Sequence, residues 1–148
     1  MATIRGFEFP AHLYYLVEKH VWCRPIEGGR VRVGLTPVAY WLLGHSLVAI
    51  GVRPGVLGQE VPQGRSVAMV ESLKYNGPLA APFAGIVLRA NEALAAEPER
   101  AMADPYGEGW IVEMLPTDWT TAGAALLSGE AALAAYRTFL ENQNITNA

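Results

Sequence analysis

Residues 66–90 read SVAMVESLKYNGPLAAPFAGIVLRA. Two apolar runs in this stretch, Ser66–Ser72 and Pro82–Ala90, have the length and the β-branched content of strands. The intervening residues, Leu73–Pro78, contain Asn, Gly and Pro, which are the residues of tight turns. We therefore predict two strands joined by a tight turn, with Lys74 at the tip of that turn.

The rest of the chain continues this pattern of short apolar runs. Its 15 glycines and 10 prolines are spread along the sequence and separate the runs. Further strands are expected at Arg30–Leu35, Ser46–Val52 (buried) and Trp110–Leu115, and helices at Val38–Leu43, Asn91–Ala96 and Ala131–Glu141. We predict a mainly β domain of six or seven short strands, closed as a small sandwich or flattened barrel, with short helices and a C-terminal helix.

Composition limits the classes of protein to consider. The chain has 148 residues, 51% of them hydrophobic and 17% charged. We expect one folded domain over residues 1–148, because a core of this size is stable without disulfide bonds or a structural metal. Residues 142–148 are expected to form a frayed tail, as chain ends often do. The longest apolar stretch, Val38–Val52, is shorter than the roughly 20 residues that span a bilayer. No membrane association and a cytoplasmic location are therefore expected.

Charge and cysteine content exclude two further classes of site. The formal net charge of −3 argues against a nucleic-acid partner, which requires a basic surface. One cysteine, Cys23, and three histidines provide too few ligands for a zinc site, so no metal is expected and Cys23 is interpreted as buried filler. Residues 91–118 hold seven acidic residues against Arg100 alone. This segment is either a docking surface for a basic partner or a solvated loop region.

Lys74 is an unusual residue for this chain, which has nine arginines and only two lysines. A guanidinium stays protonated in proteins, whereas a lysine amine can lose its proton and act as a nucleophile. A lysine at the tip of a turn is therefore a candidate for covalent modification, although it could also serve solubility alone. The sequence contains no motif of an established catalytic class.

The stretch Val70–Lys74 resembles the lipoyl-lysine hairpin of the glycine cleavage system H-protein family. The resemblance extends over about residues 14–119. The other matching segments are His20–Trp22, Val33–Thr36, Leu43-Gly44, Gly58, Val61, Gly64, Ala81-Pro82, Gly85, Asn91–Leu94 and Asp104–Trp110. Asp104–Trp110, which reads DPYGEGW, is the most specific of them.

The resemblance implies a lipoyl-domain fold and a non-catalytic carrier with lipoic acid in amide linkage to Lys74. A lipoate ligase or lipoyl transferase would recognise Glu71, Gly64 and Gly85. The residues around the arm would be Ser72, Leu73, Tyr75, Asn76, Gly77 and Pro78. The acidic segment suggests Glu92, Asp104, Tyr106 and Glu108 as docking residues for partner enzymes.

Departures from the family pattern bear on the pathway. Tyr75–Pro78 replaces the small and acidic residues that usually follow the lysine, and His45, Pro37 and Arg53–Gly55 replace acidic positions. The hairpin instead looks like that of H-protein-like lipoate-binding proteins in sulfur oxidation, whose partners belong to a heterodisulfide-reductase-like complex. We favour that pathway from the hairpin. The alternatives are glycine cleavage, with glycine decarboxylase, aminomethyltransferase and dihydrolipoamide dehydrogenase as partners, or an unmodified scaffold.

Overall fold

The computed structural model describes residues 2–147, which form twelve strands and five α-helices. The strands are β1 (Ala2–Ile4), β2 (Phe7–Phe9), β3 (Tyr14–Leu16), β4 (Val21–Pro25), β5 (Val31–Leu35), β6 (Ala49–Val52), β7 (Glu60–Val61), β8 (Ser66–Glu71), β9 (Asn76–Ala80), β10 (Gly85–Ala90), β11 (Val112–Pro116) and β12 (Leu127–Ser128). The helices are α1 (Pro37–Leu42), α2 (Ala93–Ala96), α3 (Arg100–Ala103), α4 (Trp119–Ala125) and α5 (Gly129–Gln143), with 3-10 turns at Val17–Lys19 and Glu27–Gly29.

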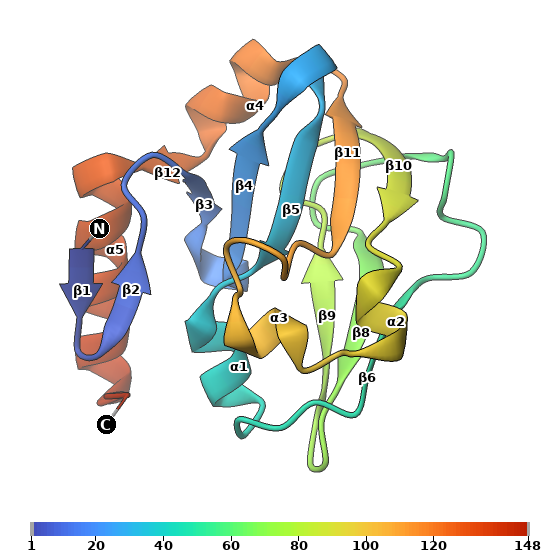
Figure 1. Ribbon diagram of the computed structural model, residues 1–148. Helices are drawn as coiled ribbons and strands as arrows, with labels where there is room; N and C mark the ends of the chain where they lie inside the picture. The colour runs from blue at the N-terminus through green and yellow to red at the C-terminus, as the bar shows by residue number, and fades with distance from the viewer. Residues whose placement is uncertain (1, 148) are drawn as a thin grey trace.

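The strands form three antiparallel sheets (Figure 1). The largest has the order β12-β3-β4-β5-β11-β10-β7, the second β6-β8-β9, and the third is the β1-β2 hairpin. More strands form than the six or seven expected. Five of the unpredicted strands have two or three residues and are too short to show an alternating pattern in the sequence. β4 and β9, with five residues each, were also not predicted. The mainly β class with short helices and a C-terminal helix is confirmed.

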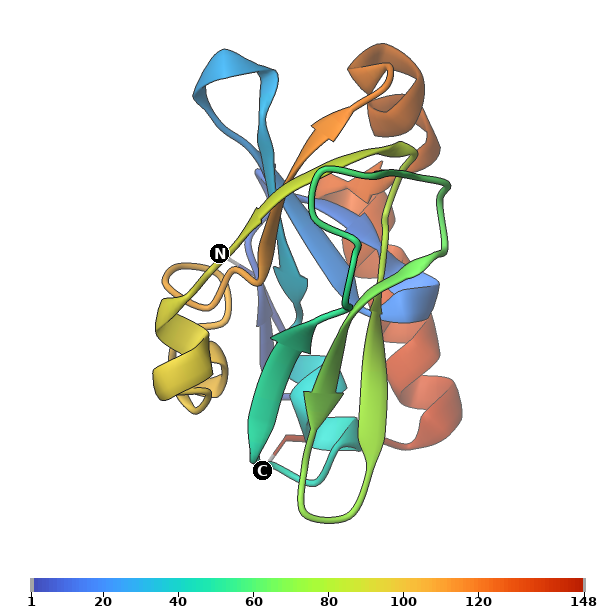
Figure 2. The ribbon, with the colours of Figure 1, turned by 90° about the vertical axis from the view of Figure 1, so that its right-hand side faces the viewer.

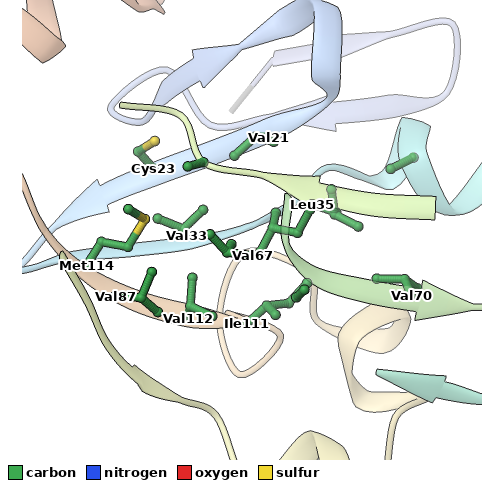
Figure 3. Packing of buried hydrophobic residues seen from close by; sticks show 14 of the residues in the cluster. Val21, Cys23, Val33, Leu35, Val67, Val70, Val87, Ile111, Val112 and Met114 are labelled. Carbon is green, nitrogen blue, oxygen red and sulfur yellow. The ribbon is translucent and has the colours of Figure 1, made fainter. Parts of the chain in front are cut away.

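The two larger sheets enclose the main hydrophobic core. Val67 of β8 faces Val33 of β5 and Val112 of β11 in Figure 3, Val70 lies further along β8, and all four are completely buried. β-Branched side chains suit this arrangement because they pack well on a pleated surface. Cys23 lies in the same core with no exposed surface, as expected for a buried filler.

The partner of strand β8 differs from the one expected. β8 pairs with β9, with Glu71 opposite Asn76 and Met69 opposite Pro78, whereas β10 belongs to the other sheet. The region 73–78 is therefore not all turn, and β9 begins at Asn76. Pro78 is compatible with a strand here because β9 lies at the edge of its sheet.

Two further expectations need correction. β6 begins at Ala49 rather than Ser46 and is half-exposed, because it is the other edge strand of the small sheet. The helix predicted at Asn91–Ala96 is reduced to α2, and the Asn91 amide donates to the carbonyls of Glu108 and Trp110 instead of capping a helix.

Helix α5 and the β1-β2 hairpin pack together around a second apolar cluster, on the side of the molecule away from α2 and α3 (Figures 1 and 2). Phe9 stacks on Tyr136 with ring centroids 4.3 Å apart. The frayed tail expected at 142–148 is wrong for its described part. α5 extends to Gln143, Ile145 is buried, and the Asn147 N–H donates to the Arg5 carbonyl. Ala148 lies outside the described residues.

Candidate functional site

Lys74 lies in a tight loop, as predicted, but this loop joins β8 to β9 and not to the strand expected at Pro82–Ala90. The side chain is exposed, and this loop projects beyond the rest of the molecule at the bottom of Figures 1 and 2. Among residues 2–147, no ion pair involves Lys74. Acylation of its amine would therefore remove a charge without breaking an ion pair of the described chain. The position fits a covalently attached group that another protein must reach.

The Ser72 hydroxyl fixes the conformation of this loop. Its Oγ accepts hydrogen bonds from the N–H groups of Tyr75 (2.9 Å) and Lys74 (3.3 Å), and it donates to the Tyr75 carbonyl at 2.9 Å. The Ser72 N–H donates to the same carbonyl at 2.8 Å. This is the local side-chain-to-backbone bonding by which serine stabilises turns. Ser72, which is buried, thus holds the backbone of Lys74 in one geometry.

A second serine, which the sequence analysis did not identify, anchors the loop from outside. The Leu73 N–H donates to Ser46 Oγ at 3.1 Å, and the Val48 N–H donates to the Glu71 carbonyl at 2.7 Å. Ser46 and Val48 belong to the segment between α1 and β6. The contact joins residues 27 apart in the chain, so no local pattern in the sequence could have revealed it.

The surface around Lys74 is apolar. Leu73 is 80% exposed and Tyr75 57%, and the nearby segment adds Val48 at 47%. Near the start of β9, next to the loop, a Cβ added to Gly77 would lie 3.3 Å from the Leu43 side chain, so the end of α1 packs closely against β9. An open hollow of about 290 Å³ lies here, with Gly77, Pro78, Leu42 and Leu43 among its lining residues.

The other predicted recognition residues lie at different distances from the loop. Glu71 is exposed at the last position of β8, opposite Asn76 at the first position of β9. Gly64 and Gly85 lie near the opposite end of the hairpin: the Gly64 N–H donates to Ala81, and Gly85 pairs with Val61 and Pro116. Glu71 therefore lies beside the loop and the two glycines lie away from it, and a recognition role for all three stays a prediction.

Close backbone approach explains only one of these glycines. A Cβ at Gly85 would lie 2.4 Å from the Leu115 carbonyl oxygen, so any side chain there would clash with β11. A Cβ at Gly64 would meet nothing within 4 Å, but its φ of +88° favours glycine. Another segment therefore approaches the backbone closely at Gly85 but not at Gly64.

The acidic segment lies beside the small sheet, where α2 contacts β6. Several of its proposed docking residues are engaged within the chain. Asp104 accepts from the Glu108 N–H, Glu108 pairs with Arg100 at 2.9 Å, and the Tyr106 hydroxyl donates to the Glu8 carbonyl at 2.7 Å. Glu92 is exposed just before α2. A docking role for Glu92, Asp104, Tyr106 and Glu108 stays a prediction.

Comparison with known proteins agrees with this geometry. The family model described as glycine cleavage H-protein matches residues 13–139. The chain belongs to the glycine cleavage H-protein family. Members of this family are non-catalytic carriers that hold a lipoyl group on a lysine.

Individual relatives resemble this H-protein family member over most of its length. Glycine cleavage system H protein 2 of Aquifex aeolicus is 35% identical over 141 residues, which cover 95% of this chain and 86% of the relative. The glycine cleavage system H protein of Chromobacterium violaceum is 39% identical, with coverages of 86% and 92%. A crystal structure of a glycine cleavage system H protein from Mycobacterium marinum superimposes with a TM-score of 0.72, at 34% identity, over 86% of this chain and 98% of that one.

Two features are absent from the described residues. None of their helices is long and apolar enough to cross a bilayer. Residues 2–147 also contain no cluster of three or more His, Cys, Asp or Glu side chains that could hold a metal ion.

Proposed function

We propose that Lys74 of this carrier bears the lipoyl group and that the group moves between partner enzymes as a tethered arm. The position of Lys74 carries this proposal: it is the exposed lysine at the tip of a hairpin whose backbone is fixed by Ser72 and Ser46. When attached, the dithiolane ring supplies the redox and group-transfer chemistry. The protein supplies a rigid base, and tethering keeps the intermediate at high effective concentration near each enzyme.

Glycine cleavage is the pathway that the comparisons support better than the sulfur pathway. The relatives named above are all described as glycine cleavage system H proteins. In that role the arm would carry an aminomethyl group between glycine decarboxylase and aminomethyltransferase, and dihydrolipoamide dehydrogenase would reoxidise it. Attachment would require a lipoate ligase or lipoyl transferase, with Glu71 as the residue placed to be recognised next to Lys74.

Sulfur oxidation is the second candidate, and the hairpin surface favours it. Tyr75 is 57% exposed beside Lys74, and Pro78 is exposed on β9. A bulky aromatic ring at this position changes the surface that an incoming enzyme must fit, and such a mismatch can exclude a partner. A heterodisulfide-reductase-like complex would then be the partner. The cytoplasmic location expected from the sequence stays a prediction.

The attachment site is tested by incubating the purified protein with lipoate, ATP and a lipoate ligase, followed by intact-mass analysis. We expect one lipoyl addition to the wild-type chain and none to Lys74→Arg, because guanidinium is not acylated under these conditions. Lys19→Arg is the matched control, since it removes the only other lysine, and it should accept the group fully. Modification that persists in Lys74→Arg would contradict the assignment.

The pathway is tested by adding the lipoylated chain to purified glycine decarboxylase and measuring exchange of bicarbonate into the glycine carboxyl group. A lipoylated glycine-cleavage H protein serves as the positive control, and lipoylation is verified by mass. Exchange comparable to the control is expected for glycine cleavage. Failure of the fully lipoylated chain to support exchange would exclude that pathway and favour sulfur oxidation.

A further inference from the structure

A row of charged side chains crosses the outer face of the large sheet, away from the hairpin. Strand register places Arg32 of β5 opposite Glu113 of β11, and Arg89 of β10 opposite the same glutamate. Arg30, just before β5, joins them. Three arginines from two sheet neighbours and a connecting segment therefore converge on one carboxylate.

Both carboxylate oxygens of Glu113 are bound by these arginines. Its Oε1 accepts from Arg30 Nη1 at 2.9 Å, and its Oε2 accepts from Arg89 Nη2 at 2.8 Å and from Arg32 Nε at 3.1 Å. The Glu113 side chain has no exposed surface. One negative charge thus faces three positive charges, and the cluster keeps an excess of two positive charges at the surface.

The guanidinium groups are held in place but remain accessible. The Arg32 and Arg89 guanidinium carbons lie 4.8 and 5.4 Å from the centroid of the Trp110 ring, which supports both. The side chains of Arg30, Arg32 and Arg89 are 39%, 29% and 56% exposed. Within residues 2–147, Arg32 donates only through Nε and Arg89 only through Nη2. Several N–H groups of a pre-ordered cluster therefore face solvent.

We propose that Arg30, Arg32 and Arg89 form a docking surface for an acidic segment of a partner protein. The guanidinium fork matches a carboxylate with two parallel hydrogen bonds. Neighbouring strands lie about 4.8 Å apart, so the cluster spans about 10 Å across β5, β11 and β10, which suits successive carboxylates better than one small anion. Neutralising Glu113 alone would not require three arginines.

The location of this surface has a functional consequence. It lies on the large sheet, whereas the loop between β8 and β9, which contains Lys74, projects from the small sheet at the bottom of Figure 1. A partner bound there would hold the carrier without covering the loop that bears the arm. The inference relies on the proposed function only for the identity of the partner as a pathway enzyme, because the surface itself does not involve Lys74.

The test uses the unlipoylated chain and a synthetic decapeptide of alternating Glu and Ser, so its outcome is independent of the attachment site. Binding is followed at low ionic strength by the NMR chemical shifts of the backbone amide and Trp indole N–H groups of the ¹⁵N-labelled protein. We expect the largest shifts at Arg32, Arg89, Glu113 and the Trp110 indole. The double variant Arg30→Gln/Arg89→Gln should bind at least tenfold more weakly, since each charge-assisted bond contributes roughly the 1.4 kcal/mol that equals a factor of ten.

The matched control is Arg65→Gln/Arg137→Gln, which removes the same charge from two exposed arginines elsewhere and should keep the wild-type affinity. Unfolding in urea verifies that each variant is folded. If Arg30→Gln/Arg89→Gln does not fold, the single variant Arg89→Lys is used in its place. It keeps the positive charge but loses the planar guanidinium fork, and it should bind the peptide several-fold more weakly than the wild type. Equal losses in both pairs, shifts centred elsewhere, or displacement of the peptide by equimolar inorganic phosphate would each overturn the proposal.

Discussion

Ser72 determines the shape of the loop that presents Lys74. Its hydroxyl bonds three backbone groups within the next three residues, and the residue itself is buried. If the backbone geometry at Lys74 matters for lipoyl attachment, the attaching enzyme recognises a folded hairpin and not a short linear motif. Ser72 is the side chain through which that dependence can be measured.

We expect Ser72→Ala to lower the free energy of unfolding by about 1 kcal/mol, the usual contribution of one hydrogen-bonding side chain. The rate of lipoyl attachment should fall by more than this loss implies, because Lys74 would no longer be held in one geometry. Urea unfolding and time-resolved intact mass measure the two effects. Ser72→Thr keeps the hydroxyl and should restore the rate. Attachment to Ser72→Ala at the wild-type rate would show that the ligase does not depend on the loop conformation.

Glu113 links strands β5, β10 and β11 on the outer face of the large sheet. Hydrogen bonds from Arg89 and Arg32 and the charges of Arg89 and Arg30 outweigh the effect of desolvation and lower the Glu113 pKa to about 2. The ordinary value is 4.5. The ionised carboxylate thus stabilises the fold above pH 4.5, and this contribution disappears as the pH falls toward 2.

We expect Glu113→Gln to lower the free energy of unfolding by about 1–3 kcal/mol near pH 6, the range for hydrogen bonds to charged groups. The difference between wild type and variant should shrink as the pH falls from 4.5 to 2, because the wild type then protonates Glu113. Urea titrations at a series of pH values measure this difference. A difference that stays constant down to pH 2 would indicate that Glu113 acts by packing rather than by charge.

The sequence predicts local features of these strands but not their long-range partners. The tip of the hairpin is predictable because Asn76-Gly77-Pro78 favours a turn. These three residues nevertheless begin strand β9, so the sequence pattern did not reveal the first half of that strand. Pro78 is acceptable there only because β9 is an edge strand, which depends on the topology of the whole sheet. Ser46 and the arginines around Glu113 are brought into position by contacts between distant segments, which no local pattern encodes.

His20 connects the β-sandwich to the C-terminal helix. Its Nδ1 lies 3.3 Å from the Tyr136 hydroxyl, which is 3.4 Å from Thr36 Oγ1, and its ring packs edge-on against Phe139 at 4.9 Å. Burial lowers the His20 pKa from 6.5 to about 4. Because the unfolded chain binds this proton more readily, stability is retained above pH 6.5 and decreases as the pH falls toward 4.

We expect the His20 imidazole to titrate near pH 4 by ¹H NMR in the folded protein. Replacement by Asn, which tolerates the left-handed backbone at φ 58°, should flatten the dependence of unfolding free energy on pH between 6.5 and 4. The change should amount to about 2 kcal/mol at most, reduced from the full linkage value because the ring is only partly buried. An imidazole that titrates near 6.5 would contradict this account of the contact with α5.

The concealment of Cys23 also affects what a lipoyl group could react with. Thiol–disulfide exchange requires a thiolate that can approach the sulfur it attacks. The only cysteine of the chain has no exposed surface, and burial raises the pKa of its thiol. A dithiolane carried on this protein therefore cannot become trapped in a mixed disulfide with its own carrier, and any sulfur exchange must take place with a visiting molecule.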